Sequence, residues 1–226
     1  MAESPSHRFG QIVGNLLEEI LQPVLKQFCE ERSLYLDVKG ARSGIRKGKK
    51  VTWADRYGNN HDLDFVIEKG AQANKRGQPV AFIEAAWRRY TKHSRNKAQE
   101  IQGAILPIFD AYPWDRPFLG AVLAGEFTKG SLNQLKSIGF QVLYFPYESV
   151  ISAFSSVGID ARFDEDTPDS EFKKCVSKIE SLSTDQHEQL KEYLVSSEKQ
   201  LFNTFLKELA AVLDRTVERL LVIPLY

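Results

Sequence analysis

Two carboxylates stand at the ends of two short apolar segments of the kind that form β-strands. Asp64 precedes residues 65–67, with Asp62 expected on the same strand face, and Glu84 follows residues 80–83. A carboxylate beside an apolar strand is unfavourable unless it has a partner or an ion. If the strands are antiparallel neighbours, the start of one lies beside the end of the other, and Asp64 meets Glu84. Such a pair is suited to hold a divalent cation for phosphodiester hydrolysis.

Positive charge is concentrated in two stretches, although the chain as a whole carries 30 basic and 30 acidic residues. Residues 39–50 contain six cations, three glycines and no acid, and we predict a mobile loop that contacts phosphates. Residues 85–99 are also basic and free of acids, and a solvated surface is the alternative for both stretches. The side chains predicted to bind DNA are Arg42, Arg46, Lys47, Lys49, Lys50, Arg89, Lys92, Arg95 and Asn96.

The elements that must position these residues combine helices and strands. Helical spacing of apolar residues predicts a first helix over 8–32, kinked or split at Pro23. Three strands that form a meander in chain order are expected next, with a hairpin turn at 58–60. We predict an α/β fold with a mixed sheet flanked by helices. The expected strands cover 33–38, 51–57, 63–68, 80–86, 117–123 and 140–145, and the helices between and after them cover 96–106, 129–138 and 148–157. Ser94 is the expected N-cap of the first of these helices, which ends near Pro107 or runs on to 112–113.

The last third of the chain is acidic and helical. Residues 160–170 are predicted to be a linker, followed by one helix over 170–182 and an unusually long one over 184–221. We therefore divide the chain into a core over 1–158 and a C-terminal helical region over 159–226. This region would pack on the core or form a dimer contact. The apolar residues 221–226 are expected to be buried, within the chain or against a partner.

The order and context of these residues resemble the PD-(D/E)xK nuclease superfamily, which includes many type II restriction endonucleases. The resemblance covers roughly residues 8–145 and rests on Asp64, a spacer of nineteen residues, and Glu84 at the end of an apolar strand. It implies a restriction-endonuclease-like sheet, Mg²⁺ bound by Asp64 and Glu84, and cleavage of double-stranded DNA by a homodimer with two symmetric sites. An acid of the first helix, Glu19 or else Glu18, would join the metal shell.

One position departs from this pattern in a way that bears on catalysis. The family keeps a lysine two residues after the second acid, where this chain has Ala86, while Leu63 in place of proline is a common variation. The lysine's role can have moved to Lys97, or else to Arg88 or Lys92. Arginine is a poor base, so Lys97 is the better chemical candidate. Alternatively, Ala86 is an engineered replacement, or the protein binds without cutting.

Bulk properties exclude several other classes. No apolar run is long enough for a membrane span, and the N-terminus lacks an apolar signal-peptide core. Cys29 and Cys175 are far apart and form no metal-binding motif, so we expect neither disulfides nor zinc, and a cytoplasmic location. The function predicted is a Mg²⁺-dependent endonuclease of restriction type. The rivals are a non-catalytic DNA-binding protein or partner subunit, and a structural or regulatory protein whose basic stretches are solvated.

Overall fold

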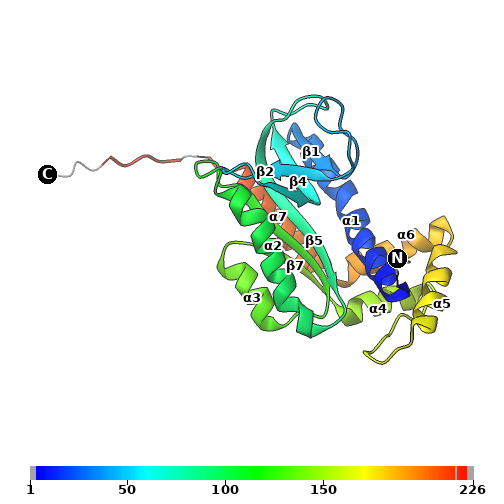
Figure 1. Cartoon of the computed structure of the whole chain (residues 1–226). Coiled ribbons are helices and arrows are strands. Elements are labelled where there is room, and N and C mark those ends of the chain that lie inside the picture. Colours follow the sequence, from blue (N-terminus) through cyan, green and yellow to red (C-terminus); the bar gives the residue numbers. More distant parts are fainter. Residues whose placement is uncertain (1–3, 217, 223–226) are drawn as a thin grey trace.

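A five-stranded mixed sheet forms the centre of the molecule in a computed structural model that describes residues 4–216 and 218–222 (Figure 1). The strand order is β1-β4-β5-β6-β7. The pairs β1–β4 and β4–β5 are antiparallel, whereas β5–β6 and β6–β7 are parallel. The predicted mixed sheet flanked by helices is therefore confirmed. The strands are β1 (Leu34–Val38), β4 (Phe65–Lys69), β5 (Gln78–Arg88), β6 (Phe118–Gly125) and β7 (Gln141–Pro146).

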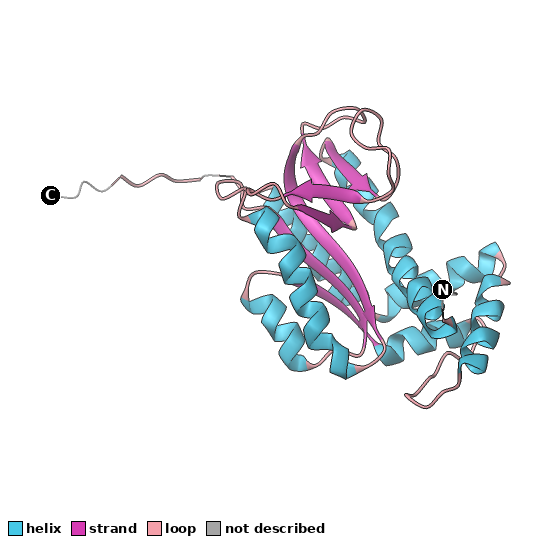
Figure 2. Ribbon diagram, viewed as in Figure 1, coloured by secondary structure: helices cyan, strands magenta, loops and turns pink. Residues whose placement is uncertain are grey.

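Helices cover both faces of this sheet (Figure 2). Alternate side chains of β5 explain the two cores, because Ile83 and Trp87 join the α1 side while Phe82 and Ala86 join the α2 side. Strands buried on both faces are apolar throughout, as β6 is. One face carries α2 (Ser94–Phe109) and α3 (Lys129–Ser137), and the other carries α1 (Pro5–Glu31), α4 (Tyr147–Ser156), α5 (Asp169–Glu180), α6 (Thr184–Ser197) and α7 (Lys199–Leu213), with the 3-10 helix η1 (Thr91–His93) preceding α2.

Helix α1 continues through Pro23 and is neither split nor ended there. Pro23 is exposed, so water can bond the carbonyl that proline leaves without a donor. The helix is 27 residues long and begins after Ser4, whose side chain accepts a hydrogen bond from the His7 N–H. No helix in the described part of the chain is both long and apolar enough to cross a membrane.

A separate two-stranded hairpin, β2 (Val51–Ala54) with β3 (Asn60–Leu63), lies between β1 and β4 in the chain. The expected strand over 63–68 is interrupted at Asp64, so the simple meander predicted from the sequence is wrong in this part. The Asp55 carboxylate fixes the hairpin turn by accepting the N–H groups of Tyr57 and Asn59. Strand β1, not the hairpin, therefore pairs with β4.

The C-terminal helices pack on the sheet. Phe205 of α7 contacts Phe118 of β6 edge-on, with ring centroids 5.4 Å apart. The single helix predicted over 184–221 is wrong, because α6 and α7 are separated at Glu198. The hydroxyls of Ser196 and Ser197 donate to the carbonyls three residues earlier. Such side-chain donors compete with the main-chain N–H groups for helix carbonyls, which weakens a helix.

The apolar end of the chain is predicted from the sequence to be buried. Leu221 and Val222 are instead 70% and 79% exposed, so the prediction of burial within the chain is wrong for these two residues. They extend away from the body of the molecule (Figure 1). The rest of that segment, residues 223–226, lies outside the described residues.

Candidate metal and phosphate site

Asp64 and Glu84 come together where β4 begins and β5 passes it. The antiparallel register pairs Phe65 with Ile83, which brings the two acids opposite each other one residue further on. The Ala85 N–H donates to Asp64 Oδ2 at 2.8 Å. The strand register and this backbone contact bring the two acids to one point, as the sequence predicts.

The electrostatics of this pair are unfavourable in the isolated chain. Glu84 is only 9% exposed, and its Oε1 is buried without a hydrogen-bond partner. Burial, and secondly the charge and hydrogen bonding of Asp64, raise the pKa of Glu84 well above its usual value. The positive charge of Lys97 opposes this rise only in part. The two carboxyl groups are therefore stable together only if one of them is protonated or if a cation is bound between them.

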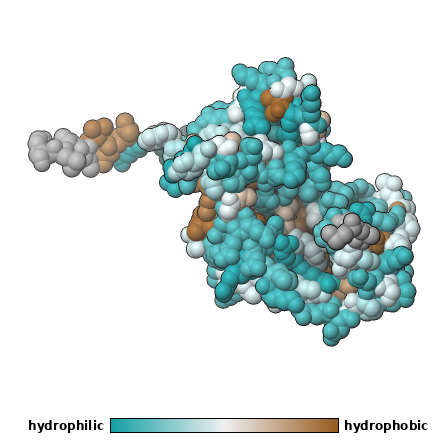
Figure 3. All heavy atoms as spheres, in the orientation of Figure 1, coloured by the Kyte–Doolittle hydropathy of each residue, from teal (hydrophilic) through white to brown (hydrophobic). Residues whose placement is uncertain are grey.

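A groove of about 600 Å³ begins at the residues that follow Glu84. Its walls are the first turns of α1, residues 85–90 and the start of α2. Basic side chains line it, among them Arg88, Arg89 and Lys97, and none of the lining residues described is acidic. Figure 3 shows the molecule hollowed on this face, between the body of the sheet and the lobe of C-terminal helices. The groove is thus suited to a polyanion.

Glu18, not Glu19, is the acid of α1 that faces the pair. Burial, and secondly the charge of Asp64, raise the pKa of Glu18, while Lys39 lowers it. Glu19 is exposed and lines a different pocket, together with His187 of α6. Helical spacing explains the difference: the groove-facing side of α1 runs through positions 7, 10, 14 and 18, whereas Glu19 continues the side formed by 8, 12 and 15. The expectation for Glu19 is corrected in favour of Glu18.

The donor set fits a hard divalent cation. The described residues include no group of three or more His, Cys, Asp or Glu side chains that could hold a metal. Mg²⁺, however, is commonly held by one or two carboxylates and otherwise by water and substrate phosphate. Asp64 and Glu84 supply those carboxylates, and the orphaned Glu84 Oε1 is an oxygen without any other partner.

Position 86, where the family keeps its lysine, is buried. Ala86 is 4% exposed and belongs to the apolar cluster beneath α2, which also contains Ala98 of that helix. Lys97 of the same helix lines the groove, and its charge acts on Glu84. Its ammonium lies 3.2 Å from Glu100, which also contacts Arg88 at 3.2 Å. Two of the three cations named as substitutes for the missing lysine, Lys97 and Arg88, are therefore held at the groove by one exposed carboxylate, whereas Lys92 pairs with Glu165.

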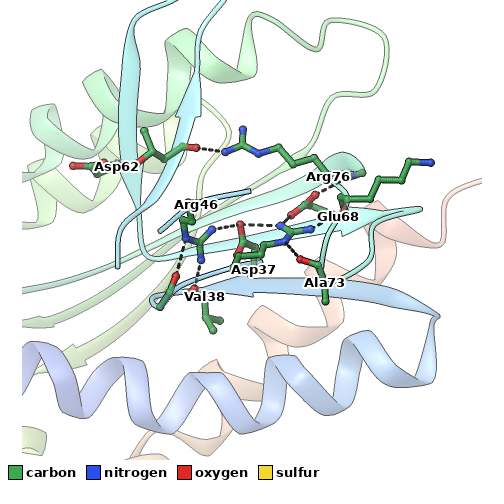
Figure 4. Close-up of polar contacts among 12 residues, drawn as sticks. Asp37, Val38, Arg46, Asp62, Glu68, Ala73 and Arg76 are labelled. Carbon is green, nitrogen blue, oxygen red and sulfur yellow. Dashed lines mark hydrogen bonds and ion pairs between the residues drawn. The ribbon is translucent and has the colours of Figure 1, made fainter. Parts of the chain in front are cut away.

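Arg42 and Arg46 of the first basic stretch belong to the interior of the fold. The Arg42 guanidinium is 3% exposed, contacts Glu68, and lies 3.0 Å from Asp37. Arg46 lies 2.7 Å from Asp37 and donates to the carbonyls of Gly40 and Val38 (Figure 4). The prediction that these arginines contact DNA is corrected, because their donors are used internally. The loop is also tied down by them, contrary to the expected mobility.

The other predicted contacts are spread over the surface. Lys47 and Lys49 are exposed, and Lys50 pairs with Asp62 at 2.5 Å. Asp62 therefore belongs to the hairpin and does not share a face with Asp64, contrary to the expectation from the sequence. Lys92 pairs with Glu165 at 2.9 Å, in the loop before α5. Arg95 and Asn96 are exposed at the start of α2.

Comparison with known proteins adds little. No family model matches the chain, and no curated protein matches it either. Among solved structures, the crystal structure of AF1548, a protein of unknown function, is similar over 83% of this chain and 99% of that one. The sequence identity is 9% and the TM-score is 0.35, so this likeness carries no functional argument.

Proposed function

We propose that this chain is a Mg²⁺-dependent endonuclease that hydrolyses phosphodiester bonds in double-stranded DNA, as restriction enzymes do. The observation that carries the proposal is a pair of carboxylates without an ion-pair partner, Asp64 and Glu84, next to a basic groove whose lining on β5 begins at Ala85. A structural acid pair would have cations in contact with it. Cleavage of both strands would be served by two copies of the chain with symmetric sites.

Each residue has a defined part in this proposal. Asp64 and Glu84 would hold Mg²⁺, and Glu18 would add negative charge from α1. When bound, the ion lowers the pKa of a coordinated water and neutralises charge on the phosphate. Lys97 would orient the attacking water, since it is the groove lysine whose charge acts on Glu84. Arg88 would stabilise negative charge on the phosphate oxygens.

One observation favours a second function, which is DNA binding without cleavage. Ala86 occupies the lysine position of the motif and is buried in an apolar cluster. If Lys97 does not take over the lysine's role, the groove would bind a polyanion and leave it intact. The two functions differ in a single measurable property, namely strand scission in the presence of Mg²⁺.

The test is cleavage of plasmid and mixed linear duplex DNA with Mg²⁺ or with EDTA. Asp64→Asn should lower the cleavage rate by at least about a hundredfold, because a metal-bound charge is worth several kcal/mol in the transition state. Asp62→Asn is the matched control, since this acid pairs with Lys50 and should leave cleavage intact. Lys97→Ala should also reduce the rate by about a hundredfold or more.

The outcomes separate the two functions. Scission that needs Mg²⁺ and Asp64 supports the nuclease. Tight DNA binding with no scission under Mg²⁺ or Mn²⁺ supports the binding protein. Equal loss in the Asp62 and Asp64 variants would contradict the assignment of the site.

A further inference from the structure

The guanidinium of Arg89 is held by aromatic rings and not by acids. Its central carbon lies 4.2 Å from the ring centre of Tyr90 and 4.4 Å from that of Phe172 in α5. Ring faces attract a guanidinium and fix its plane. Its Nη1 is buried with no acceptor, and no carboxylate among the described residues forms an ion pair with it. The charge of Arg89 is thus positioned without being neutralised.

This fixed charge faces the same groove as the candidate catalytic residues. Arg89 lines the groove together with Arg88 and Lys97. Arg88 and Lys97 share the carboxylate of Glu100, which partly offsets their charge. Arg89 has no such neighbour, so an anion that enters the groove meets its guanidinium at full charge.

The distance from Glu84 shows which part of a substrate could reach Arg89. The two positions are five steps apart along an extended chain, which corresponds to about 16 Å at roughly 3.3 Å per residue. One phosphate group cannot contact both. Along a DNA strand, phosphates recur every 3.4 Å or so of helix axis. A phosphate that meets Arg89 therefore lies some nucleotides away from the bond at the metal site.

We propose that Arg89, held in place by Phe172, binds a backbone phosphate of the DNA to one side of the bond that is cut. Phe172 is then a positioning residue, and the C-terminal helical region contributes to substrate binding as well as to the core. The inference rests on the proposed function only in taking DNA as the ligand. It does not require that the DNA be cleaved.

The experiment measures binding in EDTA by fluorescence anisotropy, using a labelled mixed-sequence duplex at several salt concentrations. Arg89→Ala should weaken binding by about tenfold, and the slope of log affinity against log salt should fall by about 0.9, the value for one phosphate. Arg32→Ala is the matched control. Arg32 also stacks on a ring, that of Phe28, but it pairs with Asp214 and should leave DNA affinity unchanged.

The role of Phe172 is tested by a double-mutant cycle. Phe172→Leu should weaken binding by a few-fold, and the double variant Phe172→Leu/Arg89→Ala should bind no more weakly than Arg89→Ala alone. Because Phe172 is buried, Tyr90→Leu provides a second route to the same loss of ring contact if the first variant unfolds. Additive losses would show that the rings do not act through Arg89 and would overturn that part of the proposal.

Failure of this inference is distinguishable from failure of the nuclease proposal. DNA binding that depends on Arg89, in a protein that never cuts, supports the phosphate site and contradicts the nuclease. Cleavage of DNA with wild-type affinity in Arg89→Ala overturns the phosphate site alone. If cleavage occurs, the loss in Arg89→Ala should fall mainly on KM and only weakly on kcat, as expected for a contact remote from the reacting bond.

Discussion

Two pairs of carboxylates lie in the same antiparallel part of the sheet, and they differ in their neighbours: Asp37 and Glu68 are both buried, whereas Glu84 is buried beside the half-buried Asp64. Asp37 of β1 and Glu68 of β4 both contact Arg42, and Asp37 also contacts Arg46. Asp64 and Glu84 form no ion pair with any cation in the described part of the chain. The negative charge of the first pair is balanced by arginines of the protein itself. The second pair has a deficit of positive charge that a ligand ion would fill.

The two basic stretches near these pairs differ in the same way. Residues 39–50 fold back on themselves, and Gly44 permits this turn because its φ is +72°, a conformation that most residues avoid. This turn brings Arg42 and Arg46 into contact with the acids of the sheet. Residues 85–99 run from β5 through η1 into α2, and Arg88, Arg89 and Lys97 stay at the groove. Backbone path, and not charge density, decides which basic residues remain available to a ligand.

The largest effect should come from removing the cation that completes the first pair. Arg42→Met leaves Asp37 and Glu68 buried with less compensation, and we expect a loss of about 3–5 kcal/mol in the free energy of unfolding. Urea denaturation measures this. Arg95→Ala, at an exposed arginine of the second stretch, should change stability by no more than about 0.5 kcal/mol.

One result for Arg42→Met would contradict the contrast between the two carboxylate pairs. If Arg42→Met costs less than about 1 kcal/mol and instead weakens DNA binding, Arg42 is a ligand-binding residue and the first pair is not self-sufficient. The double variant Arg42→Met/Glu68→Gln checks the mechanism, since removing one buried charge of each sign should recover part of the lost stability.

An intermediate effect concerns the pH dependence of the second pair. The pKa of Glu84 is raised in the folded protein, so the fold favours its protonated form. The contribution of Glu84 to stability is therefore present below its unfolded pKa and is lost as the pH rises through its folded pKa. In EDTA, urea midpoints should fall over this range. Glu84→Gln should flatten the fall, although Glu18, whose pKa is also raised, leaves a residual slope of the same sign.

Mg²⁺ should reverse this loss at neutral pH, because it binds the ionised pair. At a concentration a hundred times its dissociation constant the stabilisation would be about 2.7 kcal/mol. Glu19→Gln is the control, since this acid lies on the other side of α1 and should keep the wild-type response. A Glu84→Gln variant that Mg²⁺ stabilises as much as the wild type would show that the ion binds elsewhere.

The presence of a mixed sheet and the meeting of Asp64 with Glu84 are predictable from the sequence, because the first follows from local apolar runs and the second from the antiparallel pairing of β4 with β5. Other features depend on contacts that no local pattern encodes. Arg42 contacts Glu68, which lies 26 residues away in the chain, because β1 pairs with β4. The break at Glu198 lies within an apolar stripe that is continuous in the sequence, directly after two serines whose hydroxyls donate to main-chain carbonyls.

The choice between Glu18 and Glu19 is one that the sequence can decide. Both acids flank the apolar stripe of α1, so composition does not separate them. The phase of the helix does, because Gly10 and Gly14 mark a face with small side chains, and Glu18 lies on that face one turn further along. Small residues in helical register therefore indicate which side of α1 faces the groove.

The smallest effect should come from the exposed lysines of the first basic stretch. It tests whether any cation of that stretch is available to DNA. Lys47 and Lys49 remain predicted DNA contacts, and both are exposed. The double variant Lys47→Ala/Lys49→Ala should weaken DNA binding by only a few-fold, because exposed charge contacts contribute little. The salt slope should fall by less than about 1.8, the value for two phosphates, and unfolding should be unchanged within about 0.5 kcal/mol. Lys50 is left in place because it pairs with Asp62. A loss larger than that of Arg89→Ala would mean that the loop, and not the groove, is the main DNA surface.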